Sequence, residues 1–103
     1  MVVDICFSPA LFPFYSQPND VVVVTDIFRA TTTMCTAFLN GLSAIIPVAT
    51  TKEAEQYKDQ GFLVGAERNV VQCSFADFGN SPFEYTRDTV EGKEIVFTTT
   101  NGT

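Results

Sequence analysis

Several polar side chains stand where an apolar run has just ended or where a helix is expected to begin. Asp26 closes the β-branched run 21–25, and Arg29 follows it closely. Glu67 and Arg68 come directly after a second apolar run. Carboxylates suit a hard cation, whereas arginines, hydroxyls and free helix N–H groups suit phosphate oxygens. These residue types therefore indicate a site that binds a phosphorylated ligand together with a metal ion.

The candidate residues occupy four places along the chain. In an open α/β sheet, ligands bind beyond the carboxyl ends of the strands, and each place is an expected strand end or helix start. In chain order the candidates are Asp26, Arg29, Thr31, Thr32 and Thr33; then Glu67, Arg68 and Asn69; then Asn80, Ser81 and Glu84; and finally the segment 98–103.

Each candidate also has a purely structural interpretation. A carboxylate at a strand end is often the N-cap of the following helix, and the sequence leaves this alternative open for Asp26. Arg29 and Arg68, taken singly, are ordinary ion-pair partners. The threonine run 31–33 could simply cap a helix, and Cys35 is expected in the core. A functional assignment therefore has to rest on the four places together.

The composition argues against several classes of protein. A formal net charge of −6 repels nucleic acid, and the six Lys and Arg residues are scattered. The sequence has no His, so acid–base work falls to carboxylates, hydroxyls, a thiol or metal-bound water. Its three cysteines form no C-x-x-C pair and suggest neither a disulfide framework nor a zinc site. No apolar run approaches the ~18 residues of a membrane helix. We therefore expect a cytoplasmic protein that binds neither nucleic acid nor membrane.

Apolar runs and turn residues predict an α/β fold. Runs of strand length alternate with helical segments in the βαβαβ order of a parallel sheet with right-handed crossovers. Charged residues make up only 17% of the sequence, which favours a sheet covered on both faces in three α/β/α layers. The 103 residues suffice for one domain, 1–103. The expected strands are 2–7, 21–26, 44–48, 62–65 and 94–98, and the expected helices cover 31–40, 51–60 and a stretch that begins at 81–84.

The last residues of the sequence bear on its completeness. It stops at 98–103, directly after an expected strand, where an α/β protein would begin its next helix. We therefore expect a truncated domain or an excerpt of a longer protein. The missing part, or a second copy of the chain in a homodimer, could complete the site.

Four sequence blocks contain the candidate residues: D-I-F-R-A-T-T-T at 26–33, G-A-E-R-N at 65–69, F-G-N-S-P-F-E-Y at 78–85 and T-T-T-N-G-T at 98–103. Together they resemble the 2-phosphosulfolactate phosphatase family. The blocks occur in the family's order and cover about the N-terminal half of a typical member. Phe28 and Phe83 stand where aliphatic residues are expected in the family, and Ala66 stands where Gly is common, but no polar site group is missing.

The resemblance implies a Mg²⁺-dependent acid phosphatase that converts 2-phosphosulfolactate to sulfolactate and phosphate in coenzyme M biosynthesis. Asp26 and Glu67 are then expected to bind Mg²⁺, while Arg29 and Arg68 clamp phosphate or sulfonate oxygens. Glu84 is expected to act as a general base or to orient its neighbours. The expected substrate-binding residues are Thr31, Thr32, Thr33, Asn80, Ser81, Thr98, Thr99, Thr100 and Asn101.

The sequence leaves the chemical route and two other functions open. Metal-activated water could attack phosphorus directly, or Asp26 could form a phospho-aspartyl intermediate. Asp26 is not part of a D-x-D-x-T/V motif, which favours water. The substrate could be a different small phosphorylated hydroxy acid. The alternatives to an enzyme are an anion-binding module without turnover and an inactive fragment whose exposed sheet edge drives association.

Overall fold

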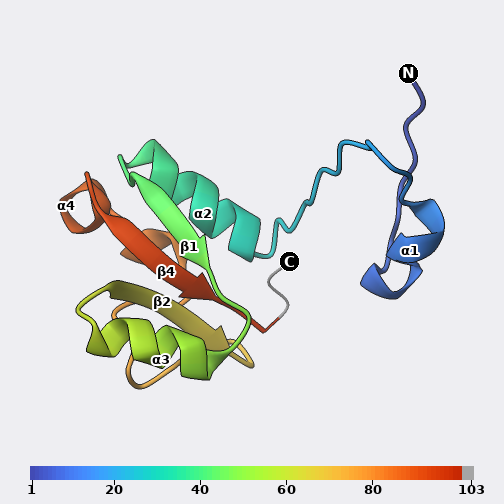
Figure 1. The fold of residues 1–103 in the computed structure, drawn as a ribbon. Helices are drawn as coiled ribbons and strands as arrows, with labels where there is room; N and C mark the ends of the chain where they lie inside the picture. The colour runs from blue at the N-terminus through green and yellow to red at the C-terminus, as the bar shows by residue number, and fades with distance from the viewer. Residues whose placement is uncertain (101–103) are drawn as a thin grey trace.

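A four-stranded sheet forms the centre of the molecule, as a computed structural model describes for residues 1–100 (Figure 1). Its strands are β1 (Ala44–Pro47), β2 (Leu63–Arg68), β3 (Val71–Gln72) and β4 (Glu94–Thr98), in the spatial order β1-β4-β2-β3. β4 pairs in parallel with β1 on one side and with β2 on the other, whereas β3 pairs antiparallel with β2. β4 therefore separates two strands that are consecutive in the chain.

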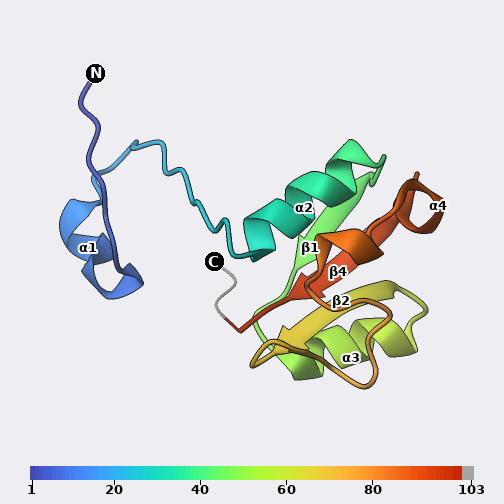
Figure 2. The ribbon, with the colours of Figure 1, turned by 180° about the vertical axis from the view of Figure 1, so that it is seen from behind.

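Helices cover both faces of this sheet (Figures 1 and 2). α2 (Ala30–Leu39) packs with Tyr85 on the face that carries Phe97. α3 (Thr51–Asp59) packs on the opposite face, which carries Val96. Because successive side chains of a strand point to opposite faces, β4 contributes to both apolar clusters. The predicted three-layer α/β/α fold with a mostly parallel sheet is confirmed.

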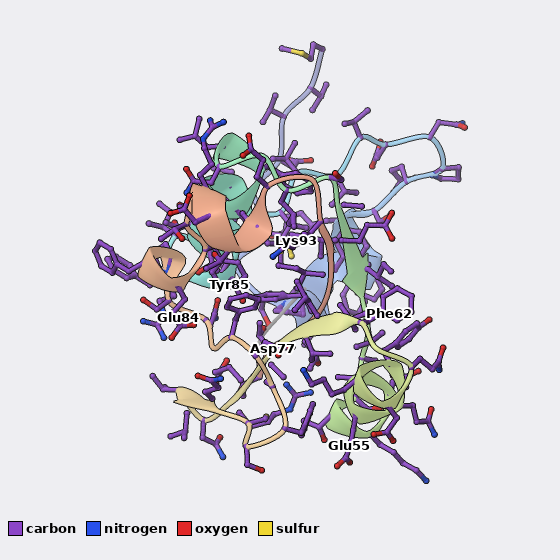
Figure 3. The ribbon with its side chains drawn as sticks, turned by 90° about the vertical axis from the view of Figure 1, so that its left-hand side faces the viewer. Glu55, Phe62, Asp77, Glu84, Tyr85 and Lys93 are labelled. Atoms are coloured by element: carbon purple, nitrogen blue, oxygen red, sulfur yellow. The ribbon has the colours of Figure 1, made fainter. Side chains whose placement is uncertain are left out.

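Gly65 in β2 leaves space for the side chain of Tyr85. A Cβ atom at position 65 would collide with the Tyr85 hydroxyl oxygen and with the ring of Phe97. The ring centroid of Tyr85 lies 5.1 Å from that of Phe78 and 6.2 Å from that of Phe97. Figure 3 shows Tyr85 directed into the body of the molecule. The glycine therefore permits a closely packed aromatic cluster over the sheet.

The helix signals of the sequence are confirmed for α2 and α3. The Thr50 hydroxyl accepts a hydrogen bond from the Glu53 N–H at 3.2 Å, and the Glu53 carboxylate accepts one from the Thr50 N–H at 3.0 Å. This pair is the capping box that the sequence predicts. Gly41 and Gly61 follow the two helices in the left-handed region, at φ of +94° and +91°.

The other helical elements are short. Within residues 1–100, no helix combines the length and the apolar character that crossing a membrane would need. These elements are η1 (Pro9–Leu11), α1 (Phe12–Tyr15), the 3₁₀-helix η2 (Pro82–Glu84) and α4 (Arg87–Val90).

Both strands predicted near the N-terminus are wrong. Residues 2–7 and 21–26 are not strands, and Val21 is 91% exposed. The segment 1–25 runs away from the sheet (Figure 1). β-branched residues favour a strand only where a neighbouring strand supplies hydrogen bonds and packing, and none lies beside this run within residues 1–100. The alternation of strands and helices therefore begins with α2 and β1.

The prediction of a buried Cys35 is also wrong. α2 packs through Ala30, Thr33 and Ala37, which lie three and four residues apart and so share one side of the helix. Cys35 is on another side and is exposed. The small residues of α2 rather than its thiol therefore face the sheet.

The capping box allows a direct test of local stability. Thr50→Ala removes the side chain that accepts from Glu53, so we expect a loss of about 1 kcal/mol in the free energy of unfolding. Urea denaturation measures this loss. Thr51→Ala is the matched control because the capping bonds of this helix use the Thr50 side chain and not that of Thr51. An equal loss in both variants would contradict the prediction.

Candidate active site

One cavity of about 460 Å³ is lined by candidates from all four predicted places of the chain. It lies beyond the carboxyl ends of β2 and β4, where an open α/β sheet commonly binds its ligand. Phe28 and Val70 also line it. Neither was predicted as a site residue, because neither side chain carries a polar group. The lining residues are Asp26, Phe28, Arg29, Glu67, Asn69, Val70, Asn80, Thr99 and Thr100.

Glu67 is the buried carboxylate of this cavity, with 6% of its surface exposed. Its Oε1 accepts hydrogen bonds from the Val70 N–H and from the Thr100 hydroxyl, the latter at 2.8 Å. Its Oε2 accepts the Thr100 N–H at a longer 3.3 Å. Burial alone would raise the pKa of Glu67, but these three bonds, together with the nearby charge of Arg68, lower it below its ordinary value. Glu67 is therefore ionised at neutral pH and joins the ends of β2 and β4.

A tight turn beside Glu67 supplies one of these bonds. Asn69 and Val70 connect β2 to β3 and both have positive φ, at +52° and +71°. Two such residues form the turn whose twist suits a hairpin. Asn tolerates this region, whereas a β-branched residue rarely enters it. The positive φ of Val70 directs its N–H toward the Glu67 carboxylate. The sequence contains no signal that predicts this conformation.

Asp26 is not the N-cap of the following helix, so that alternative is excluded. The N-cap of α2 is Arg29, and no side chain there makes a capping bond. Instead, the Asp26 N–H donates to the Thr31 hydroxyl at 3.1 Å, and the Thr31 N–H donates to the Asp26 carbonyl at 3.1 Å. These two bonds hold the Asp26 backbone and leave its carboxylate available to the cavity.

Arg29 is partly buried and lines the same cavity. Among residues 1–100, the ion pairs are Lys58–Asp77 and Arg87–Glu91, so Arg29 has no acidic partner in the described part of the chain. The ordinary ion-pair interpretation of Arg29 is therefore not supported there. A guanidinium in this position can bind an anionic ligand.

Asn80 is almost fully buried, with 8% of its surface exposed, and also lines the cavity. Its Oδ1 is buried and has no hydrogen-bond partner in the described residues. The surrounding backbone is well held: the Thr33 hydroxyl donates to the Asn80 carbonyl at 3.0 Å, and Glu84 Oε2 accepts the Gly79 N–H at 2.6 Å. The Tyr85 hydroxyl donates to the Gly79 carbonyl at 2.7 Å. The loop held by these bonds therefore carries a buried amide oxygen that has no partner in residues 1–100.

Arg68 and Thr98 bond to each other outside the cavity lining. Nη2 of Arg68 donates to the Thr98 hydroxyl at 2.8 Å and, at 3.4 Å, to the carbonyl of Ala49. Nη1 donates to the carbonyl of Glu67 at 2.6 Å. In this arrangement Arg68 links the carboxyl ends of β2 and β4 to the loop after β1, and its predicted phosphate contact stays a prediction.

The threonines at the start of α2 also lie outside the lining of this cavity. The Thr31 hydroxyl holds Asp26, the Thr33 hydroxyl holds Asn80, and the Thr32 hydroxyl donates to the Ile27 carbonyl at 2.8 Å. These hydroxyls tie the cavity-lining loops to the helix. Their predicted contact with substrate remains a prediction.

The remaining candidates have different positions. Ser81 begins η2 without a side-chain capping bond, and neither it nor Glu84 lines the cavity. Figure 3 shows Glu84 beside Tyr85 on this segment. Glu84 Oε2 accepts the Gly79 N–H, and its predicted role as a general base or an orienting residue stays a prediction. Asn101 lies outside the described residues.

A comparison with protein families identifies the relatives of this chain. The family model described as 2-phosphosulpholactate phosphatase matches residues 6–103, which is nearly the whole chain. The chain belongs to the 2-phosphosulfolactate phosphatase family. Residues at all four places of the predicted site lie within the matched region of this family.

Individual relatives bear similar names. A protein of Thermotoga petrophila named probable 2-phosphosulfolactate phosphatase is 49% identical over 79% of this chain and 36% of its own length. Proteins of the same name from Symbiobacterium thermophilum and Clostridium novyi are 47% and 41% identical, over 81% and 100% of this chain. These matches cover 37% and 45% of the two relatives. The chain thus spans less than half the length of these family members.

The lowered pKa of Glu67 predicts how stability depends on pH. Because its pKa is lower in the folded state than the ordinary ~4.3 of the unfolded state, Glu67 stabilises the fold above that value. This stabilisation is lost as the pH falls through the folded-state pKa. We expect urea denaturation between pH 7 and pH 3 to show a weaker acid dependence in Glu67→Gln than in the wild type.

Asp77 provides the control for this measurement. Burial raises its pKa, but the Lys58 hydrogen bond, the Val64 N–H and the charge of Lys58 lower it overall. Asp77→Asn should therefore remove a separate part of the acid dependence, which Glu67→Gln retains. An acid dependence in Glu67→Gln equal to that of the wild type would contradict the assignment.

Proposed function

We propose that this protein is a phosphoric monoester hydrolase that converts 2-phosphosulfolactate, or a similar small phosphorylated hydroxy acid, to its hydroxy acid and phosphate. One observation carries the proposal. Two carboxylates, Asp26 and Glu67, and the arginine Arg29 without an acidic partner in residues 1–100 line one cavity in a member of this family. The names of the relatives support the choice of substrate.

The cavity residues fit a magnesium ion. Residues 1–100 contain no group of three His, Cys, Asp or Glu side chains that could hold a metal. Mg²⁺, however, uses one or two carboxylates and fills its other positions with water and substrate phosphate. Within residues 1–100 the Asp26 carboxylate accepts no hydrogen bond, and Glu67 Oε2 accepts only one long one. We infer that Asp26 and Glu67 hold Mg²⁺, directly or through water.

Different side chains of the cavity would bind the metal ion, the phosphate and the rest of the substrate. A bound Mg²⁺ would offset negative charge on the phosphoryl group and lower the pKa of a coordinated water. Arg29 binds phosphate or sulfonate oxygens through its planar guanidinium. The hydroxyls of Thr99 and Thr100 and the amide of Asn80 line the same space and orient the ester. Arg29 and the metal ligands thus create a local site for an anion in an acidic protein.

Direct attack of water on phosphorus is the route we favour. A phospho-aspartyl intermediate on Asp26 is the alternative, and it is disfavoured because Asp26 lacks the D-x-D-x-T/V context. By its resemblance to the family, we place the reaction in coenzyme M biosynthesis in the cytoplasm. A homodimer could complete the site and is part of this proposal.

Phosphate release tests the activity. The chain and a longer version with the full length of its relatives are assayed with 2-phosphosulfolactate and related phosphorylated hydroxy acids, with Mg²⁺ or EDTA. We expect the longer protein to release phosphate only with Mg²⁺, and Asp26→Asn to abolish release without unfolding the protein. Undiminished activity of Asp26→Asn would refute both chemical routes. A folded longer protein without turnover on any ester would favour an anion-binding module.

A second substitution tests the role of Arg29. Arg29→Lys keeps the charge but loses the planar pair of donors, so we expect KM to rise roughly tenfold or more, as for the loss of a charge-assisted hydrogen bond. Steady-state kinetics of the longer protein measure the change. Arg87→Lys is the matched control because Arg87 is exposed and pairs with Glu91 outside the cavity. An unchanged KM in Arg29→Lys would count against the clamp.

A further inference from the structure

The unpaired amide of Asn80 is the least satisfied polar group of the cavity. Asn80 is 8% exposed, and its Oδ1 is buried without a hydrogen-bond partner in residues 1–100. Leaving a buried acceptor unpaired is energetically unfavourable. Such a group in a cavity lined by carboxylates and an arginine indicates a bound species that satisfies it. Asn80 therefore helps to identify what the cavity holds.

The loop that carries Asn80 is held from three directions, so the backbone of Asn80 is fixed in place. Thr33 on α2 is fully buried and donates to the Asn80 carbonyl, while Glu84 and Tyr85 bind the N–H and the carbonyl of Gly79. Thr33 is 47 residues from Asn80 in sequence. The backbone of residues 79–80 is therefore held without any hydrogen bond from the Asn80 amide. The loop is thus preorganised, and the amide oxygen remains available to a ligand.

The chemistry of the unpaired atom selects the ligand. Oδ1 is an acceptor, and an ionised phosphate ester offers only further acceptors. A cation or a water bound to a cation satisfies Oδ1, whereas a phosphate oxygen does not. Amide oxygens and carboxylates are ligands that Mg²⁺ and Mn²⁺ share. Asp26 and Glu67, which line the same cavity, supply the charge that a neutral amide lacks.

We propose that Asn80 Oδ1 is a third oxygen ligand of the divalent cation, beside Asp26 and Glu67, and that Thr33 is the positioning residue that holds it in place. This inference rests on the metal-dependent function proposed above. It also assigns to Thr33 an action through Asn80 instead of a direct contact with substrate.

Binding of Mn²⁺ to the longer protein, measured by calorimetry and electron paramagnetic resonance without substrate, tests the proposal. We expect Asn80→Ala to weaken binding roughly tenfold or more, by analogy with losses in metal coordination shells. Asn80→Asp keeps an oxygen ligand and adds charge, so it should retain or tighten binding. Gln72→Ala removes an exposed amide outside the cavity and should leave the affinity unchanged.

Thr33 provides the second arm of the test. Thr33→Val has a similar shape but cannot donate to the Asn80 carbonyl, so we expect roughly tenfold weaker Mn²⁺ binding. Thr33→Ser restores the donor and should recover the affinity. Thermal unfolding with and without Mn²⁺ checks that each variant folds. It also gives a second readout, since Mn²⁺ should raise the melting temperature of Asn80→Asp more than that of Asn80→Ala.

The outcomes separate this inference from the proposed reaction. The expected Mn²⁺ pattern in a protein without phosphatase activity would support the ligand set and refute the reaction. Phosphatase activity with Mn²⁺ affinity unchanged in folded Asn80→Ala, accompanied by a higher KM, would instead confine Asn80 to orienting the ester and overturn the inference. No Mn²⁺ binding by the wild type would overturn it as well. If Asn80→Ala does not fold, Asn80→Asp and the Thr33 pair decide.

Discussion

The insertion of β4 between β1 and β2 is the constraint on which the rest of the molecule depends. Ile95, Val96 and Phe97 of this strand are buried, and they alternate between the two apolar clusters that hold α2 and α3 to the sheet. Parallel pairing also brings the carboxyl ends of β2 and β4 together. Without β4 there would be neither a two-sided core nor a place where these two strand ends meet.

Polar contacts then convert adjacent strand ends into a defined cavity. Arg68 bonds to Thr98, and Glu67 bonds to Thr100, so the last residues of β2 are joined to β4 and to the segment after it. The charge of Glu67 is kept by hydrogen bonds in spite of burial. Glu67 can therefore join two segments of the chain through its hydrogen bonds and still bind a cation, because some of its oxygen lone pairs remain unused.

The part of the cavity lined by Asn80 depends on the aromatic cluster. Gly65 leaves space for Tyr85, and the Tyr85 hydroxyl holds the loop that presents Asn80. Burial raises the pKa of this hydroxyl far above its ordinary value, and the nearby charge of Glu84 adds to the effect, so it remains a donor. Gly65, in the middle of a strand, thereby affects the position of Asn80 through the packing of Tyr85.

The sequence by itself determined the elements whose signals are local. The capping residues around Thr50, the glycine after α3 and the apolar runs of β1 and β4 predict their structures correctly, because each depends on neighbours along the chain. The alternating pattern also predicts the α/β class. It further predicts that polar groups from separate places in the chain gather, as Asp26, Glu67 and Asn80 do around one cavity.

Only the tertiary structure decided what depends on distant partners. The valine run 21–24 has high strand propensity but no neighbouring strand within residues 1–100, so propensity alone misplaced it. Likewise, the sequence could not show that Thr33 reaches Asn80 or that Val70 adopts positive φ and donates to Glu67. These features arise from contacts that fold topology brings together, and hydrogen bonds between distant segments leave no periodic trace in a sequence.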